Sequence, residues 1–229
     1  RDKKVRQAIN YAIDKKKLIK YLRNSIGTPA TSGFVPAGMP GFDSTLVKGY
    51  SYQPKKAEAL LAEAGYPDGK GLPLITLSAS TTSKDLIEFV QGELNAIGMK
   101  VKVDVNPSAS LRDLMSKNEV TFFRGSWIAD YPDAENYLSV FYSKNRVPFG
   151  PNYTGYFNDQ FDRLFEQSYY ETNPEKRYAL YQKMDNMVLE HASIVPIYYD
   201  QSVVMLQNNI SGYPMNPLNL MILKRVQKR

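Results

Sequence analysis

The sequence predicts a mixed α/β fold, because stretches with helical periodicity alternate with short β-rich runs along the chain. Its 229 residues are 43% hydrophobic, enough to bury a core in one large domain or two small ones. No run approaches the roughly 18 consecutive apolar residues of a membrane-spanning helix. The absence of cysteine excludes disulfides, thiolate metal sites and cysteine nucleophiles.

The first half of the chain predicts helices and strands separated by glycine and proline. Val5, Ala8 and Ile9 begin an apolar stripe that predicts an amphipathic helix over residues 4–22. Because this helix starts within the first residues, we expect the chain to be a piece of a longer protein. A Gly- and Pro-rich loop is expected over residues 28–52. The next predicted elements are a helix between Pro54 and Gly65, a strand over 72–79, a helix over 84–97, a strand over 99–105 and a helix over 110–117.

The second half predicts one further strand, more helices and a β-rich end. A polar aromatic loop over residues 145–158 is expected between two of the helices. The strand is predicted over 120–126, the helices over 134–142, 159–168 and 174–190, and the β-like runs over 194–199, 202–206 and 221–226.

The chain is basic, with a net charge of +6. Such a charge suits nucleic acid, an anionic membrane surface or simply a solvated protein surface. The densest basic clusters, residues 15–17 and 224–229, are far apart in sequence and lack the interleaved aromatic residues that stack on bases. We therefore expect a solvated face and a charged tail, and no nucleic-acid partner.

Catalytic and metal-binding motifs are scarce. The single histidine, His191, ends a predicted helix, which argues against a His-based metal site or a Ser-His-Asp triad. There is no Gly-rich phosphate loop, and the acidic residues lack calcium-loop spacing. We expect no metal and no cofactor.

The most informative segment is residues 124–133. It places Arg124, the only tryptophan Trp127, and Asp130 at the end of a predicted strand, where α/β proteins often hold ligand-contacting groups. Asp130 suits a ligand ammonium group, Trp127 a flat wall and Arg124 an anion. The alternative is a core tryptophan beside a turn aspartate and a surface arginine, and spacing alone favours this alternative.

The same segment also permits an enzymatic interpretation. Asp130 and Glu135 beside a tryptophan suggest the acid and base of a carbohydrate-active hydrolase. Such pairs normally come from separate strand ends, however, and Asp133 follows Pro132 at a typical turn position. The hydrolase remains the second hypothesis.

Several motifs occur in a characteristic order along nearly the whole chain. They are the helical run 5–19, the proline-led helix 52–66, the passage 94–101, the sequence Trp-Ile-Ala-Asp-Tyr-Pro-Asp at 127–133, and the segments 156–162 and 194–197. Together they resemble family 5 of the bacterial solute-binding proteins, the extracytoplasmic oligopeptide and dipeptide receptors of ABC importers.

The resemblance implies an architecture. It implies a periplasmic-binding-protein-like (type II) lobe with a mixed sheet flanked by helices. Residues 1–193 would form the C-terminal ligand-binding lobe, and residues 194–229 would be strands returning toward an N-terminal lobe that this chain lacks. The family's signal or lipoprotein sequence would also lie outside it.

The resemblance also implies which residues bind ligand. Asp130 matches the carboxylate that pairs with a bound peptide's α-amino group. Trp127 and Ala129 would line the peptide groove, with Ile128 and Tyr131 in the same ligand-binding segment. Arg124 is similar in place to a basic residue that some members direct at the ligand's carboxylate.

The implied function is capture of peptides outside the cytoplasm, without catalysis. The implied partners are a peptide or another small solute and the permease subunits of an ABC transporter. Membrane contact would occur only through that permease or through a lipid anchor outside this chain. Family members bind dipeptides, longer peptides, nickel chelates, sugars or opines, so the fold alone does not name the ligand.

Overall fold

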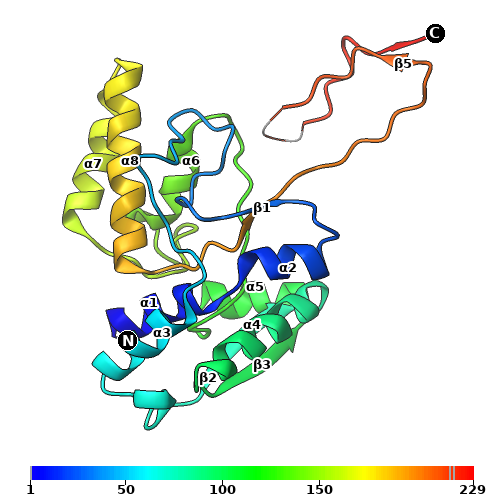
Figure 1. The fold of residues 1–229 in the computed structure, drawn as a ribbon. Helices are drawn as coiled ribbons and strands as arrows, with labels where there is room; N and C mark the ends of the chain where they lie inside the picture. Colours follow the sequence, from blue (N-terminus) through cyan, green and yellow to red (C-terminus); the bar gives the residue numbers. More distant parts are fainter. Residues whose placement is uncertain (1, 217, 219) are drawn as a thin grey trace.

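Two large hydrophobic cores organise the chain, whose computed structural model describes residues 2–216, 218 and 220–229. Helices α1 to α5 and strands β2 and β3 gather around the first core, and helices α6 to α8 around the second (Figure 1). The predicted α/β class is confirmed. Its strands form separate pairs, one parallel and two antiparallel, among the described residues.

The first predicted helix is two helices, α1 (Lys3–Ala12) and α2 (Lys15–Leu22). The prediction of one helix over residues 4–22 is wrong, because the backbone is extended at Ile13 and Asp14. The Asp14 carboxylate caps α2 by accepting the Lys17 N–H at 3.0 Å. Ile13 is fully buried, so the apolar stripe continues across a break in the backbone.

The first core is built on a β–α–β unit. Strands β2 (Ile75–Ser80) and β3 (Val101–Asn106) are parallel, with Ile75 opposite Val101, and α4 (Lys84–Ala96) connects them. The remaining elements of this half are α3 (Pro54–Glu63), which packs against α1, the short 3-10 turns η1 (Pro67–Gly69) and η2 (Thr81–Ser83), and α5 (Ser108–Ser116).

The predicted strand over residues 120–126 is reduced to one parallel bridge between Ser78 and Phe123. Ser78 donates its N–H to the Phe122 carbonyl at 2.9 Å and accepts the Arg124 N–H at 2.8 Å. The chain then leaves β2 because Trp127 and Ala129 pack against the second core. The strand prediction is therefore wrong in length, but it places Arg124 correctly beside the sheet.

The second core is rich in aromatic residues. Phe161 and Phe165 of α7 are fully buried and stack with ring centroids 6.2 Å apart, and Phe141 meets Phe161 edge to face. Its elements are α6 (Ala134–Leu138), the 3-10 turns η3 (Ser139–Phe141) and η4 (Ser143–Asn145), α7 (Asp159–Tyr170) and α8 (Pro174–His191).

Helices α1 and α8 join the two cores. The Arg6 guanidinium donates to the His191 carbonyl at 2.7 Å, and the buried Asn10 amide donates to the Ile194 carbonyl at 3.0 Å. Strand β1 (Thr28–Pro29) pairs antiparallel with β4 (Tyr198–Tyr199) and so adds a second junction. As predicted, the chain after β1 is a long irregular loop, and it buries Val35 and Met39 in the second core.

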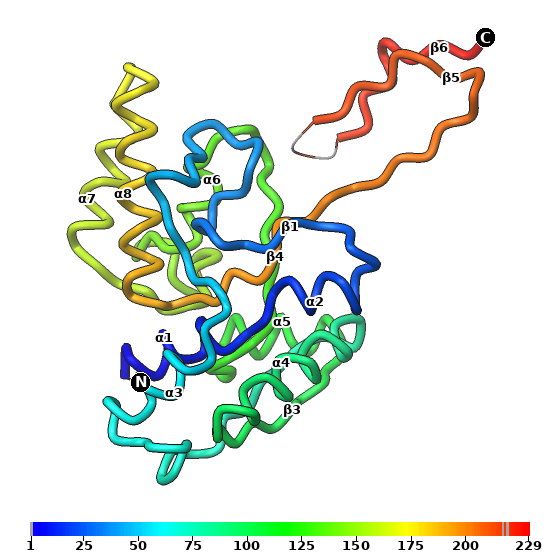
Figure 2. The backbone as a smooth tube through the Cα atoms, viewed as in Figure 1, coloured from blue at the N-terminus to red at the C-terminus, as the bar shows by residue number. Residues whose placement is uncertain are grey.

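The C-terminal residues form an extension that projects away from both cores (Figures 1 and 2). Its only described pairing joins β5 (Ile210–Ser211) to β6 (Gln227–Lys228). The strands predicted over 202–206 and 221–226 are absent from the described residues, because no neighbouring strand pairs with those runs. Their apolar side chains stay exposed, including Val203, Met205 and Met221. None of the helices described is both long and apolar enough to span a bilayer.

Candidate functional site

The predicted ligand-binding segment crosses from the edge of β2 to the start of α6. Its side chains alternate between the second core and solvent. Ala129 is buried and Trp127 is half-buried against that core, whereas Ile128 is 73% exposed and Tyr131 is 46% exposed. One side of the segment therefore packs against the second core, and the other side faces solvent.

Asn136 in α6 forms hydrogen bonds with two residues of the segment. Its side-chain oxygen accepts the indole N–H of Trp127 at 2.8 Å and the backbone N–H of Asp130 at 3.4 Å. Asn136 was not predicted from the sequence. All five residues of α6 are buried, including the polar Glu135 and Asn136, so helical periodicity does not single it out.

The Asp130 carboxylate is exposed, and no described residue forms a hydrogen bond or ion pair with it. Asp133 is different. One of its oxygens caps α6 by accepting the Glu135 N–H at 3.0 Å, and the other pairs with Arg177 at 3.1 Å. The Asp130 carboxylate is therefore exposed and unpaired among the described residues, whereas the Asp133 carboxylate fixes the end of the segment to α8.

Glu135 is a buried anchor for two phenols. The Tyr131 hydroxyl donates to one carboxylate oxygen, and the Tyr169 hydroxyl donates to the other at 3.0 Å. Burial raises the pKa of Tyr131, and the bond to Glu135 raises it further, so this phenol stays protonated. With both oxygens engaged, Glu135 has the surroundings of a structural residue.

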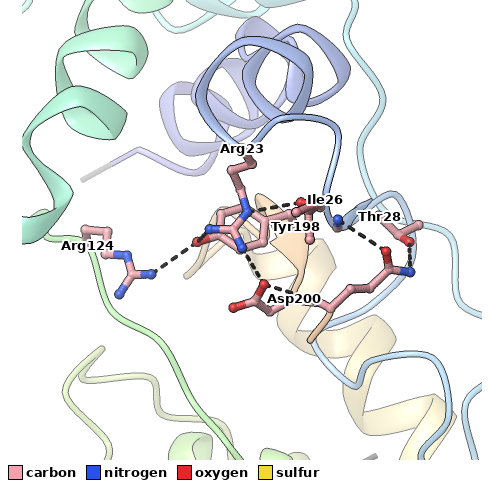
Figure 3. A network of polar contacts seen from close by, with 8 residues as sticks. Arg23, Ile26, Thr28, Arg124, Tyr198 and Asp200 are labelled. Atoms are coloured by element: carbon pink, nitrogen blue, oxygen red, sulfur yellow. Dashed lines mark hydrogen bonds and ion pairs between the residues drawn. The ribbon is translucent and has the colours of Figure 1, made fainter. Parts of the chain in front are cut away.

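Arg124 reaches the junction between β1 and β4 (Figure 3). Its guanidinium donates to the Tyr198 hydroxyl at 3.3 Å and to the Ser126 hydroxyl at 3.2 Å. Arg23 donates to the same phenol at 3.1 Å and pairs with Asp200. Among the described residues, Arg124 has no carboxylate partner, which leaves its positive charge uncompensated.

Two cavities among the described residues lie away from this segment. A hollow of about 250 Å³ is lined by Lys3, Asn158, Gln160, Met187, Glu190 and His191, and none of these residues belongs to the segment. Burial lowers the pKa of His191, and the charge of Arg6 lowers it further. Within the described part of the chain, no three His, Asp or Glu side chains gather as a metal site requires.

The segment thus presents a half-buried tryptophan beside an exposed carboxylate that has no partner among the described residues. The chain belongs to the bacterial extracellular solute-binding proteins of family 5: the family's model, described as "Bacterial extracellular solute-binding proteins, family 5 Middle", matches residues 1–149. The family resemblance drawn from the motifs is confirmed.

Two curated relatives extend this match over nearly the whole chain. Heme-binding protein A of Haemophilus influenzae is 31% identical over 219 residues, which cover 93% of this chain and 39% of that protein. Glutathione-binding protein GsiB of Shigella flexneri is 30% identical over 220 residues, with coverage of 93% and 43%. The chain thus spans about two fifths of the length of these relatives.

Solved structures confirm the predicted fold of a type II periplasmic binding protein. The periplasmic binding protein DppA from Helicobacter pylori, in complex with the peptide STSA, superposes with a TM-score of 0.85 at 27% identity, covering 99% of this chain and 44% of that one. HbpA2 from Haemophilus parasuis gives a TM-score of 0.86 at 25% identity, with coverage of 99% and 45%. These relatives are binding proteins and not enzymes, which favours the solute-binding hypothesis over the hydrolase interpretation of Asp130 and Glu135.

Proposed function

We propose that this chain is one lobe of an extracytoplasmic receptor that captures peptides and delivers them to the permease of an ABC importer. Residues 1–193 form the ligand-binding lobe, and residues 194–229 return toward a second lobe encoded elsewhere in the same protein. Support comes from family membership, from the peptide-bound DppA and from the length of the relatives. The exposed apolar side chains of the extension are suited to packing against that second lobe.

The observation that carries the proposal is the unpaired carboxylate of Asp130. The Asp130 carboxylate is exposed in this lobe and would become buried only when a second lobe covers it. Once buried in a medium of low dielectric, a carboxylate requires a partner. A peptide's α-amino group then supplies a charge-assisted hydrogen bond that closure protects from water. The ligand therefore binds the closed receptor more tightly than the open one. Ligand binding then shifts the equilibrium toward the closed form, which docks on the permease.

The neighbouring residues complete the groove. Trp127 and Ala129 form its wall on the side of the second core, while Ile128 and Tyr131 project toward the ligand and the covering lobe. Arg124 lies at the β1–β4 junction with an uncompensated charge, and it is suited to an anionic group of the ligand. In this arrangement the two ends of a peptide zwitterion meet opposite charges.

Calorimetric titration of the full-length protein tests the proposal. The probes are the peptide STSA with a free amino terminus and the same peptide acetylated there. Replacing Asp130 by Asn is expected to weaken binding of the free peptide about tenfold to a hundredfold, since a hydrogen bond to a charged group contributes about 1.5–3 kcal/mol. It is expected to leave the acetylated peptide's weaker binding unchanged.

The matched control is Asp85→Asn, which removes one exposed carboxylate from the first turn of α4. It is expected to leave both affinities unchanged. Equal affinity of the wild-type protein for free and acetylated peptide would exclude a role for the α-amino group. Binding of hemin or glutathione but of no α-linked peptide would overturn the proposed ligand class and leave the proposed receptor role in place.

A further inference from the structure

The indole of Trp127 and the backbone of Asp130 are held by one side chain. We propose that Asn136 is the positioning residue of the binding segment: it fixes the segment in its ligand-ready conformation and determines which of the segment's groups a ligand can meet. This inference rests on the proposed function, because it assumes that ligand binds at the Trp127–Tyr131 segment.

The geometry at Asn136 uses the full capacity of an amide oxygen. That oxygen has two lone pairs, and it accepts two N–H groups from residues three positions apart in the segment. The bond from the Trp127 indole, at 2.8 Å, is short and strong, and the one from the Asp130 backbone, at 3.4 Å, is longer. Asn136 itself is only 6% exposed, so water cannot easily replace it as the acceptor.

The position of Asn136 is fixed in turn by α6. Its N–H donates to the Asp133 carbonyl at 3.2 Å, and its own carbonyl accepts the Ser139 hydroxyl at 2.8 Å. The ion pair between Asp133 and Arg177 ties this first helical turn to α8. The neighbouring residue Glu135 holds Tyr131. Consecutive residues of one short, well-anchored helix therefore set the course of the whole segment.

This arrangement limits what the segment offers to a ligand. The indole N–H is already used, so the side chain of Trp127 can present its ring but no hydrogen-bond donor. The Asp130 N–H is used as well, so Asp130 presents only acceptors, namely its carboxylate and its backbone carbonyl. At Trp127 and Asp130 the segment thus favours a ligand end that is cationic and tolerates apolar neighbours, whereas a ligand carboxylate would meet Arg124.

The first test is spectroscopic and needs no ligand. Because Trp127 is the only tryptophan of the 229-residue chain, the chain gives a single indole ¹H–¹⁵N signal. Asn136→Leu keeps the side chain's size and removes the acceptor. It is expected to shift this signal and to speed exchange of the indole proton with solvent. Asn136→Asp restores an acceptor oxygen and is expected to restore slow exchange.

Val188→Ala supplies the control for a general loss of stability. Val188 is fully buried in the same core, and it has no part in the segment. This variant is expected to lower Tm while leaving the exchange of the indole proton unchanged. An indole signal that is the same in Asn136→Leu and in the wild type would overturn the inference, as would a change of equal size in Val188→Ala.

The second test is the affinity of the full-length protein for the peptide STSA. Asn136→Leu is expected to weaken it about tenfold, whereas Asn136→Asp and Val188→Ala keep it within about threefold of wild type. Unchanged affinity in Asn136→Leu, alongside normal wild-type binding, overturns the positioning role. Failure of the wild type itself to bind any peptide overturns the proposed function instead, and the indole measurement then still reports on Asn136.

Discussion

The Arg23 guanidinium lies over the ring of Tyr198, with its Cζ atom 4.2 Å from the ring centroid, and also donates to the phenol hydroxyl at 3.1 Å. Arg124, at the start of the binding segment, donates to the same hydroxyl at 3.3 Å. One phenol oxygen thus links α2, the binding segment and β4 (Figure 3). Because Arg23 is paired with Asp200, Arg124 carries the uncompensated charge of this junction, and that charge favours an approaching anion.

Removal of the shared acceptor is the first prediction. Tyr198→Phe keeps the ring beneath Arg23 and removes the oxygen that accepts from both arginines. We expect the free energy of unfolding to fall by about 1 kcal/mol, measured by urea denaturation. Tyr170→Phe is the control, since Tyr170 is 85% exposed, and a change below about 0.5 kcal/mol is expected there. Equal losses of unfolding free energy in the two variants would show that the Tyr198 hydroxyl does not stabilise the fold through the two arginines.

The second prediction concerns Arg124 as an anion-binding residue. In the full-length protein, Arg124→Gln is expected to weaken binding of the peptide STSA about tenfold, because a charge-assisted bond to its carboxylate is lost. The C-terminal amide of that peptide is expected to bind wild type and variant alike. Titration calorimetry with both peptides measures this difference.

Arg112→Gln is the matched control for that measurement. Arg112 is exposed on α5, so its replacement removes the same charge from the surface. No effect on either peptide is expected. If the amide and the free acid lose affinity equally in Arg124→Gln, the guanidinium supports the fold of the junction and does not contact the ligand carboxylate.

The third prediction follows from Lys15, which was expected on a solvated face and is buried. Its ammonium donates to the carbonyls of Ala30 at 2.7 Å and Tyr50 at 3.0 Å, so it ties α2 to the long loop. Burial lowers the pKa of Lys15 to about 8. Between that value and the unfolded value of 10.5, the unfolded chain binds more protons than the folded chain.

The stability contributed by Lys15 therefore rises with pH across this window. Relative to Lys15→Met, the wild-type free energy of unfolding is expected to increase by about 3 kcal/mol between pH of about 8 and 10.5. Urea denaturation at several pH values measures the difference. The exposed neighbour gives the control variant Lys16→Met, for which a flat profile is expected. A flat profile for Lys15→Met as well would show that the buried ammonium keeps its ordinary pKa.

Elements with clear boundary residues were predictable from the sequence. Pro54 and Gly65 delimit α3 because one fits the first helical turn and the other adopts a positive φ after the helix end. The break between α1 and α2 was not predictable in this way. Ile13 maintains the apolar stripe while its backbone is extended, and hydrophobic periodicity reports burial, not backbone conformation.

The candidate site was predictable only in part. The motif around Trp127 identified the segment, and Arg124 lies beside the sheet as expected. Asn136, Arg23 and Tyr198 were missed, because their contacts depend on how α6, α2 and β4 approach the segment in space. A single sequence contains no periodic signal for such approaches.

The junctions between the two cores have a mechanical consequence. Arg6 binds His191 at the end of α8, Asn10 binds Ile194 just after it, and the β1–β4 pair forms a second junction, so a rotation about either junction alone would break the other. We therefore expect the two cores to turn together as one rigid body. Any rotation of the first core would then carry α7 and α8 with it, without any change inside the lobe.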